Sequence, residues 1–217
     1  MNSMFCVYIG LDIDVREYGV DTHEIWHIHQ QNRTPEIEDR MAYEFDYSTL
    51  PIDIITVYNN APDETAAPPG KSAISIYVTT KYDGWLTLLD ENGKKTEKYR
   101  EIKEKCALQL IDRLAEIIKI PDLRDHVKVM EAATPLTLNK FSGARKGTPL
   151  GNKWTVKNLI PPILWGTKVK NLYNTGMFTF PSGSMAPVML SGSFVAKGIV
   201  KKLKKMEEKE AKKSKKK

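Results

Sequence analysis

Cysteines are few in this sequence and long apolar runs are missing, and both features narrow the classes of protein to consider. The two cysteines, Cys6 and Cys106, lie far apart without C-x-x-C spacing, so we expect buried, reduced thiols of a cytosolic protein. No apolar run reaches the roughly 18 residues that span a bilayer, so we expect no membrane span. The N-terminus, MNSMFCVYIGLDID, lacks the basic start and small-residue cleavage site of a signal peptide, so we expect a cytoplasmic protein.

Two common nucleotide-binding motifs are also missing. Gly143, Gly147 and Gly151 are spaced four apart, which is not the G-x-G-x-x-G pattern. The run GTPLGNK likewise falls short of the phosphate loop, G-x-x-x-x-G-K-[ST]. We therefore predict an ordered loop in which glycine permits the turns and Arg145 and Lys146 supply positive charge.

Excess positive charge is confined to the end of the chain. The net charge is +6, yet residues 201–217 hold ten lysines against three glutamates, and the remainder has 23 basic and 24 acidic residues. We predict that residues 201–217 form a disordered, solvated tail. Contact with an anionic membrane surface or with RNA is the alternative, because clustered lysines attract phosphate. The tail has no aromatic residue for base stacking, so we expect no specific nucleic-acid partner.

The rest of the chain has the composition and patterning of a folded protein. Hydrophobic residues make up 41% and charged residues 28% of the 217 residues, which fits one or two globular domains. Strands are predicted at residues 4–13, 25–29, 52–60, 72–80 and 126–135. The clean alternation of residues 72–80 places Ile74, Ile76 and Val78 on one face. Successive strands joined by loops predict an antiparallel sheet with one buried face.

A helical period replaces the alternation after Thr96. Cys106, Leu110 and Leu114 fall on one side of an amphipathic helix, which Pro121 is predicted to end. We expect this helix to pack over the sheet.

Three histidines in the second predicted strand raise the question of a metal site. His27 and His29 would share one strand face, opposite Trp26, and spacing places no third ligand beside them and His23. A half-exposed strand face is therefore the prediction, and we expect no metal site.

The stretch from Asn171 to Val200 is predicted to form a strand, a loop and a helix. The strand would begin at Leu172 and end at Gly176, and small residues on the helix would let another backbone pack closely. Such a junction directs backbone N–H groups and the positive end of the helix dipole at an anionic or carbonyl-rich ligand. The alternative is an ordinary strand-to-helix connection in an α/β layer.

Several sequence motifs follow one another along the chain in a defined order. They are DETAAPPGKSAISI (63–76), the long helix, EAATPLTLNKFSG (131–143), GTPLG (147–151) and NLYNTGMFTFPSGSMAPVMLSGSFVAKGI (171–199). This ordered set resembles the C-terminal part of the flavin-dependent phytoene desaturase, carotenoid isomerase and retinol saturase superfamily, related to the amine oxidases. The resemblance extends from about residue 4 to residue 202. In that family the order ends in a strand, a glycine-rich loop and a helix with the flavin at its N-terminus.

Two departures from the family pattern bear on what the resemblance implies. The family begins with a dinucleotide-binding strand, a G-x-G-x-x-G turn and a helix, and this sequence has none of them. The chain therefore looks like less than the full enzyme, and a separately encoded N-terminal FAD-binding partner or a truncated gene would explain this. Secondly, Ser182, Ser184 and Ala186 stand where the family has glycines, so their side chains would narrow the approach of a flavin.

The resemblance implies two groups of site residues and no metal. The cofactor-binding group is Gly176, Gly183, Ser184, Met185, Ala186 and Pro187. The substrate-lining group is Thr134, Pro135, Thr137, Gly147 and Gly151. In the first group, Met185 and Ala186 would offer backbone N–H groups to the flavin and Pro187 would start the helix. No catalytic residue is implied, because the flavin carries the redox chemistry in this family.

The implied fold class is α+β, in three parts. Residues 1–165 would form part of an antiparallel substrate-binding domain whose sheet is covered by the long helix. Residues 166–200 would supply a strand-loop-helix piece of an FAD-binding α/β domain, and residues 201–217 the disordered tail.

The implied function is that of the C-terminal portion of an FAD-dependent oxidoreductase or isomerase acting on polyene or isoprenoid substrates. FAD would bind only with a complementary dinucleotide-binding part. One alternative is a non-catalytic lipid- or partner-binding remnant, cytoplasmic and in peripheral contact with a membrane through the lysine tail. Another is a gene fragment that folds poorly.

Overall fold

The computed structural model describes residues 2–29, 34–58, 67–149, 151, 166–179, 181 and 183–214. The chain divides into two compact units, Met1–Thr148 and Pro149–Lys217. The division falls earlier in the chain than the boundary expected after residue 165. Each unit is described by itself.

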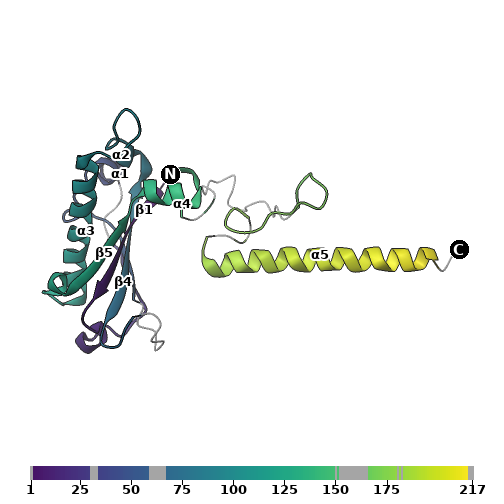
Figure 1. Ribbon diagram of the computed structural model, residues 1–217, viewed down its shortest axis with the longest axis horizontal. Coiled ribbons are helices and arrows are strands. Elements are labelled where there is room, and N and C mark those ends of the chain that lie inside the picture. The colour runs from purple at the N-terminus through teal and green to yellow at the C-terminus, as the bar shows by residue number, and fades with distance from the viewer. Residues whose placement is uncertain are drawn as a thin grey trace. The chain divides into compact units, whose positions relative to one another are not determined.

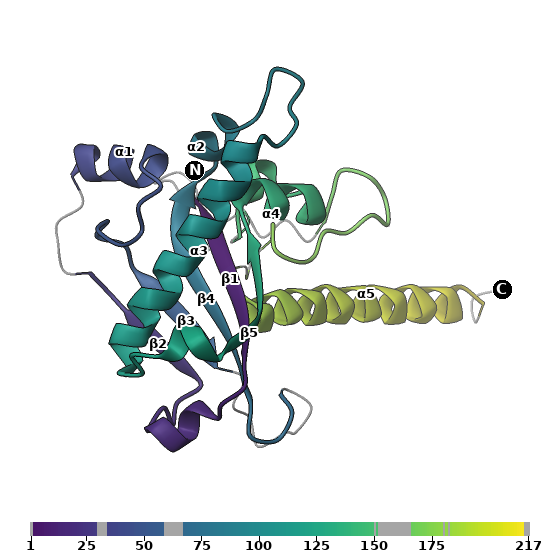
Figure 2. The ribbon, with the colours of Figure 1, turned by 60° about the vertical axis from the view of Figure 1, so that its left-hand side comes forward.

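The first unit is built on a five-stranded antiparallel sheet with strand order β2-β3-β4-β1-β5 (Figures 1 and 2). The strands are β1 (Asn2–Leu11), β2 (Glu24–His27), β3 (Ile54–Tyr58), β4 (Ser72–Lys81) and β5 (Val127–Ala133). Every pair of neighbouring strands in this sheet is antiparallel, as the sequence predicted. The succession of strands joined by loops therefore predicted the type of sheet correctly.

One face of the sheet is buried under the long helix α3 (Glu97–Ile118), which crosses the strands in Figure 2. Ile74, Ile76 and Val78 of β4 are at most 1% exposed, and Leu110 and Leu114 of α3 are fully buried in the same core. Burial of these side chains removes a large apolar area from water and is the main term that stabilises this layer. The predicted packing of the helix over the sheet is confirmed.

Specific residues define both ends of α3. The Oγ1 of Thr96 accepts a hydrogen bond from the backbone N–H of Tyr99 at 3.1 Å, which caps the first turn. Lys119 takes the left-handed conformation that closes the helix, with φ of 60°. Pro121 follows, where it cannot continue the helix.

Short helices complete the first unit. They are η1 (Val15–Tyr18), α1 (Pro35–Tyr43), α2 (Tyr82–Leu86), η2 (Leu123–His126), α4 (Pro135–Ser142) and η3 (Arg145–Gly147). Helix α2 inserts Trp85 into the core, where its ring stacks on Phe5 with centroids 5.2 Å apart and meets Tyr99 edge-on at 5.8 Å. Such aromatic pairs add to the stabilisation from burial alone.

The cysteines and histidines of the first unit have structural surroundings. Cys6 and Cys106 are buried free thiols, as expected. His27 is exposed at the end of β2, and the backbone N–H of His29 donates to Asp53 Oδ1 at 2.9 Å. Within the described ranges, no three His, Cys, Asp or Glu side chains gather in a way that would hold a metal ion.

The second unit contains one long helix, α5 (Met185–Ser214), and the segment of residues 166–179. The strand predicted from Leu172 to Gly176 is not formed. Tyr173 makes only an isolated antiparallel bridge to Gly166, and the N–H of Leu172 turns back to the carbonyl of Val169 at 3.2 Å. These turn hydrogen bonds satisfy the backbone locally, so the segment forms turns in place of a strand.

Helix α5 extends further than the sequence predicted. Residues 201–214, predicted to be disordered, are helical, and residues 215–217 lie outside the described part. The run after Gly198 has no proline or glycine and consists largely of lysine, glutamate, leucine, methionine and alanine, which are good helix formers. Among the described residues, no helix is long and apolar enough to cross a membrane. The molecule as described is α+β, as predicted.

Candidate functional site

The predicted T-P-x-T turn forms the N-terminus of α4. Thr134 is the N-cap, and its Oγ1 accepts a hydrogen bond from the backbone N–H of Thr137 at 3.4 Å. Pro135 occupies the first turn, where its missing N–H has no helical partner to lose. These three residue types therefore fix where α4 begins.

The same turn is connected to α3 and to the loop around Gly147. Thr134 is fully buried, and its Oγ1 lies 2.7 Å from the hydroxyl of Tyr99 on α3. Gly147 has φ of +60°, and a Cβ there would overlap the carbonyl oxygen of Pro135. Its own carbonyl accepts a hydrogen bond from Ser3 Oγ at 2.7 Å. The structure thus brings four predicted substrate-lining residues together, in contacts that join β1, α3, α4 and η3.

The fifth predicted substrate-lining residue, Gly151, lies in the second unit and packs against the loop before α5. It has φ of +78°, and a Cβ there would overlap the carbonyl oxygen of Met177. Glycine is required here both for the backbone conformation and for the close approach. Gly151 therefore lies next to the residues predicted to bind cofactor.

Ser191 fastens this loop to α5. The side chain is fully buried, its Oγ accepts a hydrogen bond from the Gly176 N–H at 2.9 Å, and it lies 3.1 Å from Thr175 Oγ1. The same hydroxyl donates to the carbonyl of Val188 at 2.7 Å. At Gly192, a Cβ would lie 3.6 Å from Thr175 Oγ1. The predicted approach of another backbone is therefore found at Ser191, whereas Gly192 has only an ordinary van der Waals distance to a side chain.

The predicted cofactor-binding residues lie around the N-terminus of α5. Gly176 and Gly183 have φ of +99° and +106°, and Ser184 and Ala186 are exposed. Met185 is 81% exposed and begins the helix, two residues before the expected start at Pro187. Pro187 still falls within the first turn, where its missing N–H breaks no helical hydrogen bond.

This arrangement can accept an anionic or carbonyl-rich group. The first backbone N–H groups of α5 have no partner within the helix, and they carry the positive end of its dipole. Ser184 and Ala186 add side chains next to those N–H groups, and Ser182 lies outside the described residues. The described sheet is wholly antiparallel, so the described residues contain no parallel strand-helix-strand unit of the kind that binds a dinucleotide.

A row of apolar side chains crosses the sheet on the face opposite α3. The strand register places one residue from each strand side by side, in the order Trp26, Ile55, Tyr77, Cys6 and Ala133. We call these five residues the apolar row. Trp26 is 60% exposed, and Ile55, Tyr77 and Ala133 are partly exposed.

Aromatic and acidic side chains both border the apolar row: Glu24 accepts a hydrogen bond from the Trp26 indole N–H, and Glu131 is paired with Tyr8. The rings of Tyr8 and Tyr77 meet edge-on with centroids 6.2 Å apart. Burial raises the pKa of the Cys6 thiol to about 11, and burial is also the main cause that raises the pKa of Tyr8. Both groups are therefore uncharged at neutral pH, which suits an apolar ligand. The alternation of β4 in the sequence predicts that Tyr77 lies on the face opposite Ile74, Ile76 and Val78. Which residues of the other strands lie beside Tyr77 depends on the strand register, which the sequence does not give.

Known proteins with similar sequences come from one superfamily. No family model matches the chain. Over 205 residues it is 23% identical to all-trans-retinol 13,14-reductase of Danio rerio, with 89% of this chain and 33% of that protein covered. Over 155 residues it is 30% identical to chloroplastic prolycopene isomerase 2 of an Oncidium hybrid cultivar, with 70% of this chain and 24% of that protein covered. Over 205 residues it is also 27% identical to 4,4'-diapophytoene desaturase of Staphylococcus aureus, with 92% of this chain and 38% of that protein covered.

The chain is a relative of the phytoene desaturase, carotenoid isomerase and retinol saturase superfamily. It spans between about a quarter and two fifths of the length of these relatives. The resemblance drawn from the sequence motifs is therefore confirmed. The names of these three relatives specify retinol, prolycopene and diapophytoene.

Proposed function

We propose that this chain provides the substrate-binding sheet and the last loop and helix of the flavin site in an FAD-dependent oxidoreductase or isomerase. Its substrate would be a polyene or an isoprenoid. A complementary dinucleotide-binding part would hold most of the FAD, and the bound flavin would supply hydride-transfer chemistry. The apolar row carries this proposal, because it aligns one uncharged side chain from each of the five strands, and all of them except the buried Cys6 could contact a long hydrophobic substrate.

The apolar row also matches such a substrate in its lack of charge. A polyene has no group that hydrogen-bonds along its chain, so a site for it must be apolar and avoid unpaired polar atoms. Trp26 and Tyr77 contribute aromatic surface, and Ile55 and Ala133 contribute aliphatic surface. The similarity to retinoid and carotenoid enzymes supports the same substrate class.

Binding of all-trans-retinol to the purified chain, followed by retinol fluorescence, tests the role of the apolar row. Ile55→Asp and Tyr77→Asp each place a carboxylate in the row, and we expect each to weaken binding by at least about tenfold. Phe141→Asp is the matched control, because Phe141 is 81% exposed on α4 and lies outside the row. Retained binding in both row variants would contradict the proposal.

The flavin part of the proposal has a separate test. The chain is purified together with a dinucleotide-binding protein of the same superfamily, and the visible absorption of bound flavin is measured. Flavin retained only in the joint preparation supports a shared site. Flavin absent from both preparations would contradict an active enzyme.

A non-catalytic lipid-binding protein is the second candidate function. The exposed side chains of Ser184 and Ala186 favour it, since the related pattern has glycine at these positions. In that case retinol binding would depend on the apolar row while no preparation retains flavin. The two measurements together therefore distinguish the candidates.

A further inference from the structure

Helix α5 has one side that its own unit covers. Ser191 is fully buried there and Val195 is 8% exposed. Further along the same side, the Lys202 ammonium donates to Asn171 Oδ1 at 3.1 Å and to the Tyr173 hydroxyl at 3.2 Å. The segment of residues 166–179 thus occupies this side as far as Lys202.

About a third of a turn around α5 from this covered side lie exposed apolar side chains. Met189, Val200 and Leu203 are between 50% and 70% exposed. With 3.6 residues per turn, these three positions fall within an arc of about 60°. We call them the apolar stripe. Exposed large apolar side chains aligned along one side of a helix indicate a surface that contacts an apolar phase or partner.

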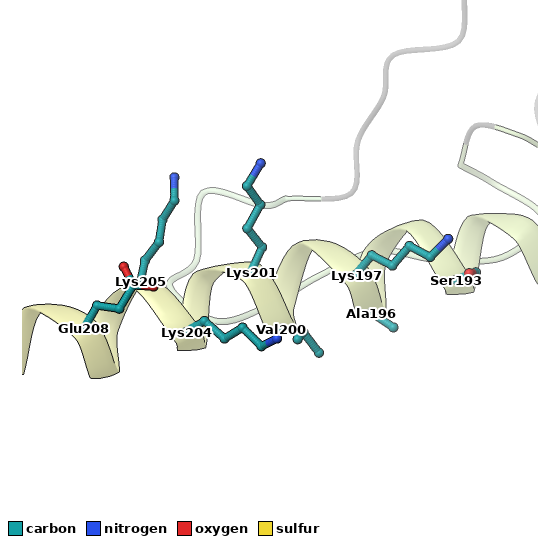
Figure 3. Close-up of a pocket in the computed structure, with 8 residues that line it drawn as sticks. All are labelled: Ser193, Ala196, Lys197, Val200, Lys201, Lys204, Lys205 and Glu208. Atoms are coloured by element: carbon teal, nitrogen blue, oxygen red, sulfur yellow. The ribbon is translucent and has the colours of Figure 1, made fainter.

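Lysines flank the apolar stripe. An open groove of about 610 Å³ runs along this side of α5, lined by Ser193, Ala196, Lys197, Val200, Lys201, Lys204, Lys205 and Glu208 (Figure 3). We call it the basic groove. Its four lysines form no ion pair in the described part of the chain, and Glu208 is the single carboxylate in its lining. In Figure 3, Lys201 and Lys205 extend away from the helix on one side and Val200 on the other.

We propose that the apolar stripe and the basic groove of α5 dock this chain on an anionic phospholipid surface. The helix would lie in the plane of the interface, with Val200 and Leu203 entering the acyl boundary and the ammonium groups of the neighbouring Lys197 and Lys204 reaching the phosphates. Charge complementarity identifies this partner, since the lining of the basic groove has four lysines and one glutamate.

Nucleic acid fits the same surface less well. Lysines also bind RNA phosphates, but RNA would leave the apolar stripe uncovered in water. Binding of single-stranded RNA gains from stacking on aromatic side chains, and the sequence has none between Lys197 and Ser214. The apolar stripe is thus the feature that favours lipid over RNA.

Sedimentation of the full chain with vesicles tests this proposal independently of the proposed enzymatic function. We expect binding to phosphatidylcholine vesicles that contain phosphatidylserine, weaker binding at high salt, and little binding to pure phosphatidylcholine. Each lysine near an anionic surface adds about fivefold to binding, so the pair Lys197→Glu and Lys204→Glu should weaken it by at least about 25-fold. The pair Val200→Asp and Leu203→Asp should also weaken binding, with helix content unchanged by circular dichroism.

The matched control for charge is the pair Lys94→Glu and Lys98→Glu in the first unit. Both lysines are exposed, and the pair changes the net charge by the same amount. We expect this control to bind vesicles as the unmodified chain does, and an equal loss would overturn the proposal. Vesicle binding that is unchanged by Val200→Asp and Leu203→Asp would also overturn it, as would binding to homopolymeric RNA without binding to vesicles.

Discussion

Gly147 and Gly143 differ in the reason that glycine is needed, and a single substitution at each position can separate backbone conformation from close packing. Both have positive φ, +60° and +67°, but only Gly147 lies against another backbone group, the carbonyl of Pro135. Gly143→Ala should destabilise the chain by about 1 kcal/mol, the cost of the left-handed conformation. Gly147→Ala should cost about 1–3 kcal/mol more, because the new Cβ also forces the backbone apart. Denaturant unfolding followed by tryptophan fluorescence measures both.

The comparison of the two variants decides between packing and ligand contact at Gly147. Equal destabilisation would show that α4 moves freely to accommodate a side chain, which contradicts the close contact with Pro135. A loss of retinol binding without a loss of stability would assign Gly147 to the substrate site itself.

Ser191 is the residue on which the loop before α5 depends. Ser191→Ala removes the oxygen that accepts the Gly176 N–H, in a site where Ser191 itself is fully buried. Leaving that donor unpaired costs about 1–3 kcal/mol. We therefore expect the Gly176 amide to exchange its hydrogen on the order of ten- to a hundredfold faster, measured by hydrogen exchange. Ser193→Ala, an exposed position on the same helix, is the control and should leave this rate unchanged.

At the scale of elements, His126 links η2 to the end of β1. Its Nδ1 lies 2.9 Å from Asp12 Oδ1, and its Nε2 lies 3.5 Å from Asp122 Oδ2. Hydrogen bonding to Asp12 is the main cause that raises the His126 pKa above its usual value of 6.5. A raised folded-state pKa stabilises the protein below the unfolded-state pKa, and this stabilisation is lost as pH rises through the folded value.

The unfolding free energy should therefore contain a component that falls as pH rises from about 6 towards 8. The carboxyl of Asp12 contributes a pH dependence of stability with the opposite sign. Lys128 and His126 lower its pKa, so the stabilisation it gives is lost as pH falls below about 4. Denaturant unfolding across this range should show both slopes. His126→Gln should remove the first slope, and persistence of that slope in the variant would assign it to another group.

The secondary-structure elements show which parts of the fold sequence patterns predict. Alternation in β4 and the helical period of α3 follow directly from one-sided burial, so both were predicted. The strand predicted at Leu172 was wrong because strand formation depends on a neighbouring strand, and turn hydrogen bonds satisfied the backbone instead. Residues 201–214, predicted to be disordered, are helical because lysine, glutamate, leucine, methionine and alanine all have high helix propensity, which outweighs the repulsion between the lysines.

The candidate site was predictable as a set of residues but not as an arrangement. The sequence motifs named Thr134, Pro135, Thr137 and Gly147, and the structure brings these four together. Their contacts with Tyr99 and Ser3 come from segments far away in the chain, which no local pattern specifies. The apolar row depends on the register of four strand pairs, and local sequence patterns do not predict that register.

At the scale of the whole molecule, the proposed flavin site requires the N-terminus of α5 to meet a complementary dinucleotide-binding part. Ser184 comes immediately before α5, is exposed, and carries a side chain where the related pattern has glycine. Removing that side chain would let the backbone N–H groups at the helix start approach the flavin more closely. We therefore expect Ser184→Gly to strengthen flavin retention in the joint preparation by about two- to tenfold, measured as bound flavin absorption after gel filtration.

Ser193→Gly is the matched control for the Ser184→Gly variant. Ser193 is also exposed and lies two turns further along α5, away from the helix N-terminus. A glycine within the helix lowers helix stability without opening the N-terminal approach, so flavin retention should stay the same or fall. Equal gains in both variants would indicate that loosening of the helix, and not access to its first N–H groups, controls flavin binding. Weaker retention in Ser184→Gly alone would instead identify the Ser184 hydroxyl as a ligand of the flavin and contradict the steric argument.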